Sequence, residues 1–228
     1  SGSVQPSTFY VAADVWTRKQ GESWGLGKIF GAFETPHEFV TQLLEVAHNR
    51  HFYEIIRAGR SCKAYFDLEA APGVWDKATG WEKCKAVMRA WEMRVQERWP
   101  TAKVVCPRCL AHMVLDGSRM TEAGWKVSYH VIYPWLVFPC NTTILKGEAV
   151  LLSARPEFQY RDKANVLKPF VDPTVYTNNR QFRLLLNCKL SDSTRTALNL
   201  ASPPTLSSFS LSCITYIGPD VWRVPSES

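Results

Sequence analysis

The sequence predicts a mixed α/β fold, in one large domain or in two small modules that share a core. Runs rich in aromatic and β-branched residues predict strands at 52–56, 62–69 and 125–133. Apolar residues that recur every three or four positions predict a long amphipathic helix over 79–99, and its tryptophans, including Trp81 and Trp91, are expected in the core. The length of 228 residues, with 46% hydrophobic and 21% charged residues, is ordinary for a globular protein.

The composition limits the possible partners. The formal net charge of +6 is compatible with a polyanionic partner. The seven cysteines are scattered and odd in number, and no signal peptide is evident, which favours free thiols in a reducing compartment. No apolar run approaches the roughly 18 residues that a membrane-spanning helix needs, so we expect no membrane partner.

The first elements lie before residue 50. Residues 4–34 are mixed, and Gly25-Leu26-Gly27-Lys28 is too short for a phosphate-binding Walker loop. We therefore expect an ordinary loop there, in which Lys28 can still contact a phosphate. Residues 35–38 have the composition of a helix start, because a capping threonine, a proline and a glutamate complete a capping box.

The most informative strand is 62–69. Side chains alternate across a strand, so Asp67 and Glu69 share one face while Phe66 and Leu68 share the other. Two residues along a strand span roughly 6.5 to 7 Å, which lets two carboxylates converge on ions between them. Paired carboxylates repel each other unless a positive charge is present, and hard oxygen ligands suit Mg²⁺ or Mn²⁺. A solvated polar face on an edge strand would give the same pattern.

The helix over 79–99 ends at a proline, and two short strands are expected after it, at 103–106 and 111–115. The segment 106–109 places two cysteines three residues apart, with His112 three positions further on. A structural zinc site needs a fourth ligand, and none is evident nearby. We therefore expect a hairpin turn with two free thiols.

A second informative strand covers 125–133. Lys126, Ser128 and His130 fall on one face, and the apolar residues between them fall on the other. An ammonium, a hydroxyl and an imidazole can all donate hydrogen bonds, as a triphosphate site requires. An amphipathic strand with no ligand gives the same alternation.

The remaining elements are less regular. A short helix is expected at 143–154, followed by an irregular, charged stretch at 155–170, and an apolar segment then delivers Asp172 at a strand end. A turn and a strand follow over 178–189, and their basic residues are Arg180, Arg183 and Lys189. After 191 we expect loop and strand on the surface.

Together these segments supply three carboxylates, a strand face of hydrogen-bond donors and a basic segment after the third carboxylate. Two metal ions held by Asp67, Glu69 and Asp172 would suit in-line nucleotidyl transfer. One ion activates the attacking 3′-hydroxyl, and the other neutralises the triphosphate and the leaving pyrophosphate.

The order of these motifs resembles that of the archaeo-eukaryotic primase superfamily, most closely the eukaryotic primase-polymerases. The resemblance rests on 52–69, 126–130 and 170–184, and it covers residues 10 to 190 in order. It implies an α/β (α+β) catalytic core over 1–228. In that core, a module with an RRM-like sheet spans about 51–228, and a small helical N-terminal module spans about 4–50.

The resemblance also implies roles for individual residues. Asp67, Glu69 and Asp172 would be catalytic and would bind two Mg²⁺ or Mn²⁺ ions. Ser128 and His130 would contact the phosphates of the incoming nucleotide. Further basic contacts to the nucleotide are implied at Lys126, Arg180, Lys189 and, where the family often has arginine, Lys28.

The implied function is template-directed addition of dNTPs, with NTPs as an alternative substrate, to a primer 3′-hydroxyl on single-stranded DNA. The family works in damage tolerance, translesion synthesis and replication restart, in the nucleus or the mitochondrion, and single-strand-binding proteins are possible partners. No C-terminal Cys/His zinc module is evident, so we expect primer extension more than de novo priming. Two alternatives remain: a two-metal nuclease, and a catalytically idle module that binds single-stranded nucleic acid through its basic and aromatic residues.

Overall fold

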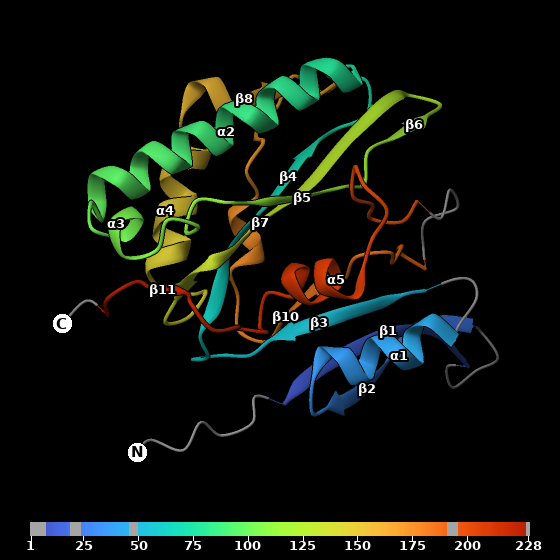
Figure 1. The fold of residues 1–228 in the computed structure, drawn as a ribbon. Coiled ribbons are helices and arrows are strands. Elements are labelled where there is room, and N and C mark those ends of the chain that lie inside the picture. The colour runs from blue at the N-terminus through green and yellow to red at the C-terminus, as the bar shows by residue number, and fades with distance from the viewer. Residues whose placement is uncertain (1–7, 19–23, 46–49, 191–195, 227–228) are drawn as a thin grey trace.

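A computed structural model gives the fold of residues 8–18, 24–45, 50–190 and 196–226 (Figure 1). The elements form a mixed α/β fold with mainly antiparallel sheets, which confirms the predicted class. No helix in these ranges is long and apolar enough to span a membrane. The helices are α1 (Pro36–Glu45), α2 (Lys77–Arg98), α3 (Ala102–Val105), α4 (Ile144–Ser153) and α5 (Leu206–Ser212), with 3-10 turns η1 (Pro156–Phe158) and η2 (Pro173–Val175).

The first sheet has the strand order β10-β3-β1-β2, and every neighbouring pair in it is antiparallel. Its strands are β1 (Phe9–Arg18), β2 (Trp24–Phe33), β3 (Phe52–Ile56) and β10 (Arg180–Arg183). The predicted strand at 52–56 is confirmed. The sheet also joins strands from the N-terminal part of the chain to a strand that begins at residue 180.

The expected helical N-terminal module and the loop at 25–28 are both wrong, because Phe9–Arg18 and Trp24–Phe33 form the antiparallel strands β1 and β2. The glycines of β2 alternate with larger residues, so they share one face of the strand. A Cβ atom added at Gly27 would lie 2.6 Å from Thr17 Cγ2, so glycine is needed for close packing there. Glycine therefore marks a crowded strand face in this segment and not a loop.

Helix α1 begins as predicted at Pro36. The Thr35 hydroxyl accepts a hydrogen bond from the Glu38 backbone N–H at 3.2 Å, which caps the first turn. Phe39 of this helix packs against the rings of Phe9 and Phe52, at centroid distances of 5.8 and 5.4 Å. The helix therefore covers one face of the first sheet.

The second sheet is built around the long strand β7 (Gly124–Phe138). Its other strands are β4 (Cys62–Ala70), β5 (Met113–Asp116), β6 (Arg119–Thr121) and β11 (Trp222–Arg223). The strands predicted at 62–69 and 125–133 are confirmed, and they are antiparallel neighbours. Their register pairs Asp67 with His130 and Glu69 with Ser128, so the two polar faces predicted separately form one surface.

Helix α2 lies along the apolar face of this sheet, opposite the polar surface that β4 and β7 form (Figure 1). Trp91 is fully buried and meets the ring of Phe66 edge-on at 5.1 Å. Trp81, also expected in the core, keeps 38% of its surface exposed. The predicted helix is therefore confirmed, but only one of these two tryptophans is a core residue.

The two sheets meet through aromatic side chains. The ring of Tyr65 on β4 lies 4.9 Å from Phe182 on β10 and 5.0 Å from Tyr176. The Tyr176 hydroxyl also donates a hydrogen bond to the backbone oxygen of Tyr65 at 2.5 Å. These buried contacts fix the acidic strand β4 beside the basic strand β10.

Three segments differ from expectation. Residues 102–105 form helix α3 and not a strand, and both valines in it are highly exposed. The segment after 191 contains helix α5, whose capping box joins Thr205 and Ser208. The stretch 155–170, expected to be irregular, holds a small ribbon made by β8 (Gln159–Arg161) and β9 (Leu167–Pro169). The helix predicted at 143–154 is confirmed as α4.

Candidate active site

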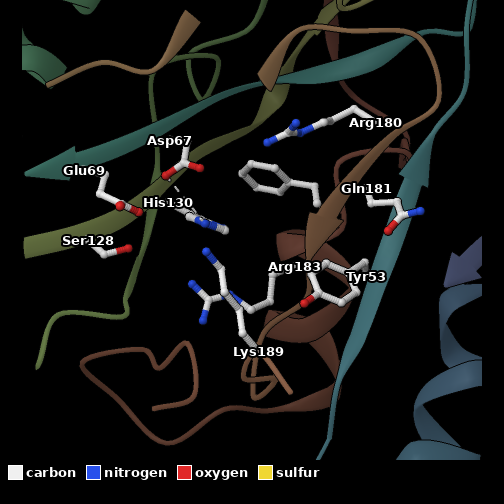
Figure 2. A pocket seen from close by; sticks show the side chains of 10 residues that line it. Tyr53, Asp67, Glu69, Ser128, His130, Arg180, Gln181, Arg183 and Lys189 are labelled. Carbon is white, nitrogen blue, oxygen red and sulfur yellow. Dashed lines mark ion pairs between the residues drawn. The ribbon is translucent and has the colours of Figure 1, made fainter. Parts of the chain in front are cut away.

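A pocket opens where the two sheets meet, and both sheets contribute side chains to it (Figure 2). The second sheet provides the acidic and polar side, and the first sheet together with the segment after β10 provides the basic side. The lining residues are Tyr53, Asp67, Glu69, Ser128, His130, Arg180, Gln181, Phe182, Arg183 and Lys189.

Asp67 is the most perturbed carboxylate of the pocket. Burial, followed by the nearby charges of Glu69 and Asp172, raises its pKa to about 7 against the opposing effect of Arg183 and Lys189. Its Oδ1 atom is buried and has no hydrogen-bond partner. The Nε2 atom of His130 lies 3.8 Å away, which is too far for a hydrogen bond. One oxygen of the Asp67 carboxylate is therefore buried without a hydrogen-bond donor.

Asp172 reaches the site through the backbone. Its N–H donates a hydrogen bond to the backbone oxygen of Asp67 at 2.9 Å, and Val171 forms a bridge with Leu68. The Asp172 side chain accepts a hydrogen bond from the Thr174 N–H at 2.8 Å and so caps η2. Asp172 is thus adjacent to the pocket but is not among its lining residues.

Three positive groups face these carboxylates in different ways. Lys126 forms an ion pair with Glu69, with 2.6 Å between Nζ and Oε1. Arg183 is buried in the pocket, and desolvation lowers its pKa from the usual value. Lys189 also has a lowered pKa, first because of burial. Burial therefore disfavours the charged forms on both sides of the pocket.

His130 is neutral at physiological pH. Burial, followed by the charges of Arg183, Lys189 and Arg180, lowers its pKa well below the usual value. Its ring packs on Phe182 with 4.2 Å between centroids, and its Nδ1 atom is buried without a hydrogen-bond partner. A neutral imidazole can donate from one nitrogen and accept at the other.

Lys28 lies beside the pocket and not in its lining. It forms an ion pair with Asp14, and its ammonium sits 4.0 Å from the centroid of the Tyr53 ring. The Tyr53 hydroxyl donates to Asp14 Oδ2 at 2.7 Å, and burial raises the pKa of that hydroxyl. Tyr53 therefore separates Lys28 from the carboxylates.

The structure brings most of the predicted site residues together. Six of them line the pocket: Asp67, Glu69, Ser128, His130, Arg180 and Lys189. Asp172 and Lys126 contact two of these residues, and Lys28 lies one side chain further away. The sequence prediction omitted Tyr53, Gln181, Phe182 and Arg183 from the site. Arg183 had a signal, since it lies in the predicted basic segment.

The negative charge of the carboxylates would suit a bound cation, although the side chains are not arranged as a complete set of metal ligands. Within the described ranges, no three His, Cys, Asp or Glu side chains form a group that could hold a metal ion. The uncompensated Oδ1 of Asp67 and its crowding by two further carboxylates are nevertheless what a bound cation would relieve. We regard Asp67 and Glu69 as the residues best placed to bind one.

The cysteines at 106 and 109 have other surroundings. Cys106 Sγ donates to the backbone oxygen of Asp220 at 3.3 Å, and His112 pairs with Glu92 at 3.4 Å. Both cysteines carry free thiols. In this conformation the thiol of Cys106 and the imidazole of His112 therefore have separate partners.

Comparison with protein-family models finds no match to this chain, and comparison with curated proteins finds none either. A functional proposal therefore depends on the geometry of the chain's own residues.

Proposed function

We propose that this chain is a template-directed nucleotidyltransferase, a primase-polymerase core. It would add dNTPs, or NTPs, to the 3′-hydroxyl of a primer on single-stranded DNA. One observation carries the proposal: uncompensated groups of opposite charge face the same pocket. Asp67 Oδ1 lacks a donor, while the Nε–H groups of Arg180 and Arg183 lack an acceptor. A metal-bound phosphate would satisfy both sets at once.

The acidic side of the pocket would bind the metal. Asp67 and Glu69 would hold divalent ions, and Asp172, whose backbone N–H bonds to Asp67, would contribute once its side chain leaves the η2 cap. When bound, Mg²⁺ or Mn²⁺ supplies activation of the 3′-hydroxyl and neutralisation of the leaving pyrophosphate. Lys126 would compete with the metal for Glu69, so binding would free its ammonium for a phosphate oxygen.

The basic side would orient the triphosphate. Arg180, Arg183 and Lys189 present cationic donors, and a phosphate would offset the burial that now disfavours the charge of Arg183 and Lys189. Ser128 and neutral His130 would add hydrogen bonds without further charge. Held from both sides, the triphosphate would be fixed before reaction, which is how enzymes of this class gain most of their rate.

The test is extension of a 5′-labelled primer on a single-stranded template with dNTPs and either Mg²⁺ or Mn²⁺. We expect templated extension by the wild type and loss of at least about 100-fold in rate for Asp67→Asn. The matched control is Glu157→Gln, which removes the same charge from an exposed site on η1 and should extend normally. Extension by Asp67→Asn at the wild-type rate would refute the proposal.

The same assay separates the alternatives. A two-metal nuclease would shorten the labelled primer without dNTPs, because hydrolysis needs the carboxylates but not the basic side of the pocket. A catalytically idle binding module would retain the primer on the protein and leave its length unchanged. Either result would replace the polymerase proposal.

A further inference from the structure

The two faces of strand β2 have opposite characters. Gly25, Gly27 and Gly31 share the face that α1 covers, where Phe33 meets Phe39 of the helix at 5.1 Å. The other face carries large apolar side chains. Together with Trp16 of β1, which pairs with Leu26, this aromatic face consists of Trp16, Trp24, Leu26 and Phe30.

These four side chains are exposed although they are apolar. The exposed fraction is 42% for Leu26, 54% for Trp16, and 67% for both Trp24 and Phe30. Three of them lie on β2, an edge strand of the first sheet, and Trp16 lies on the neighbouring strand β1; exposed apolar residues at a sheet edge promote aggregation unless they have a function. With this much of their surface exposed, these rings contribute little to the packing of the fold.

The aromatic face continues into the pocket. Cross-strand pairing places Phe30 opposite Ala12, Ala12 opposite Tyr53, and Tyr53 opposite Arg183. Opposite residues in antiparallel strands point to the same side of the sheet. This row therefore leads from two pocket residues to the exposed edge, across three strand spacings or roughly 15 Å.

The charges on this side of the sheet favour an anionic partner. Lys28 and Arg18 lie on the same face as the rings, opposite Asp14 and Trp24. The acidic Asp14 is compensated by Lys28 and by the Tyr53 hydroxyl. Exposed aromatic rings interleaved with cationic side chains are typical of surfaces that stack unpaired bases and track a phosphate backbone.

We infer that the aromatic face is a stacking platform for unpaired bases of a single-stranded DNA segment whose neighbouring nucleotides lie at the pocket. This inference deepens the proposed function, on which it rests for the identity of the strand as a template. Binding itself needs neither metal nor catalysis. Trp24 and Phe30, the most exposed rings, stack on bases, while Lys28 and Arg18 contact phosphates.

The experiment measures binding of a fluorescein-labelled 20-nucleotide oligo-dT by anisotropy, in a chelator and without nucleotide. We compare the wild type, Trp24→Ala, Phe30→Ala and the double variant with Ile29→Ala. Ile29 is the matched control, because it is an exposed apolar residue of the same strand that points to the opposite face. Unchanged unfolding midpoints establish that each variant folds.

We expect each aromatic variant to weaken binding at least about fivefold, and the double variant to weaken it further. Ile29→Ala should bind like the wild type. Because stacking releases few counterions, the slope of log Kd against log salt concentration should stay the same in all variants. Removal of a phosphate contact would instead lower that slope.

Equal affinity in the wild type and the double variant would overturn the inference, and so would a wild type that does not bind the oligonucleotide. A wild type that forms dimers dissociated by Trp24→Ala would also overturn it, by showing that a second copy covers the face. Binding that depends on the rings, in a protein with no templated extension, would keep the platform and refute the proposed polymerase function.

Discussion

Replacing Asp67 with asparagine should stabilise the metal-free protein at pH 8. Burial and two neighbouring carboxylates raise the pKa of Asp67 to about 7 in the folded protein, from an ordinary value of 3.8. The folded state therefore binds this proton more tightly than the unfolded state does. The stabilisation that comes from this tighter proton binding at Asp67 is complete below pH 3.8 and is lost as the pH rises through 7.

The size of the effect follows from the shift in pKa. Three pKa units correspond to about 4 kcal/mol. About a fifth of the Asp67 side chain, 19%, is exposed. Because water relieves part of the cost, we expect a gain of about 2 kcal/mol for Asp67→Asn at pH 8. The gain should shrink at pH 5, where the wild-type carboxyl is protonated in the folded state.

Urea unfolding in a chelator, at pH 5 and pH 8, measures this difference, with Glu157→Gln as the charge-matched control. A variant less stable than the wild type at both pH values would refute the reasoning, because it would show that the folded protein compensates the carboxylate. Mn²⁺ at 100 times its Kd should add about 2.7 kcal/mol to the wild type and less to the variant.

Further substitutions test the packing around the site. Glu148→Ala should lower the free energy of unfolding by about 2 to 4 kcal/mol in urea, because it leaves two arginines of α2 without their buried carboxylate. Gly80→Ala should cost about 1 to 3 kcal/mol, because the added Cβ would lie 2.5 Å from Val127 Cγ2. Gly147 also lies within a helix, but no atom lies within 4 Å of a Cβ added there. Gly147→Ala should therefore raise the free energy of unfolding by about 1 kcal/mol. Glu54→Ala should cost about 2 kcal/mol and speed limited proteolysis after residue 213, because two backbone N–H groups there lose their acceptor.

The strands that carry most of the site could be predicted because local pattern determines them. Alternation alone places Asp67 and Glu69 on one face of β4, and Ser128 and His130 on one face of β7. Alternation does not say which strands are neighbours. The pairing of Asp67 with His130 is a tertiary fact, and it turns two separate patterns into a single surface.

The errors have a different physical origin. Glycines in 25–31 suggested a loop because glycine is common in turns, but here their lack of a side chain permits close packing against β1. The valines of α3 suggested a strand because they are β-branched, although backbone hydrogen bonds to Thr101 and Ala102 make that segment helical. Packing between strands therefore explains the first error, whereas local backbone hydrogen bonds around two exposed valines explain the second.

The pocket residues that the prediction missed come from the pairing of β10 with β3, which joins positions more than 120 residues apart. That pairing places Arg183 beside Tyr53 and turns both toward the carboxylates of the other sheet (Figure 2). The acidic and basic groups nevertheless do not satisfy each other through these atoms. Asp67 Oδ1, Arg180 Nε and Arg183 Nε are all buried without a hydrogen-bond partner. A buried ion pair built for stability would have closed these contacts, because an uncompensated buried charge costs several kcal/mol. The separation of acidic and basic groups across one pocket is therefore better explained by a ligand with a cationic and an anionic part, as a metal-bound triphosphate has.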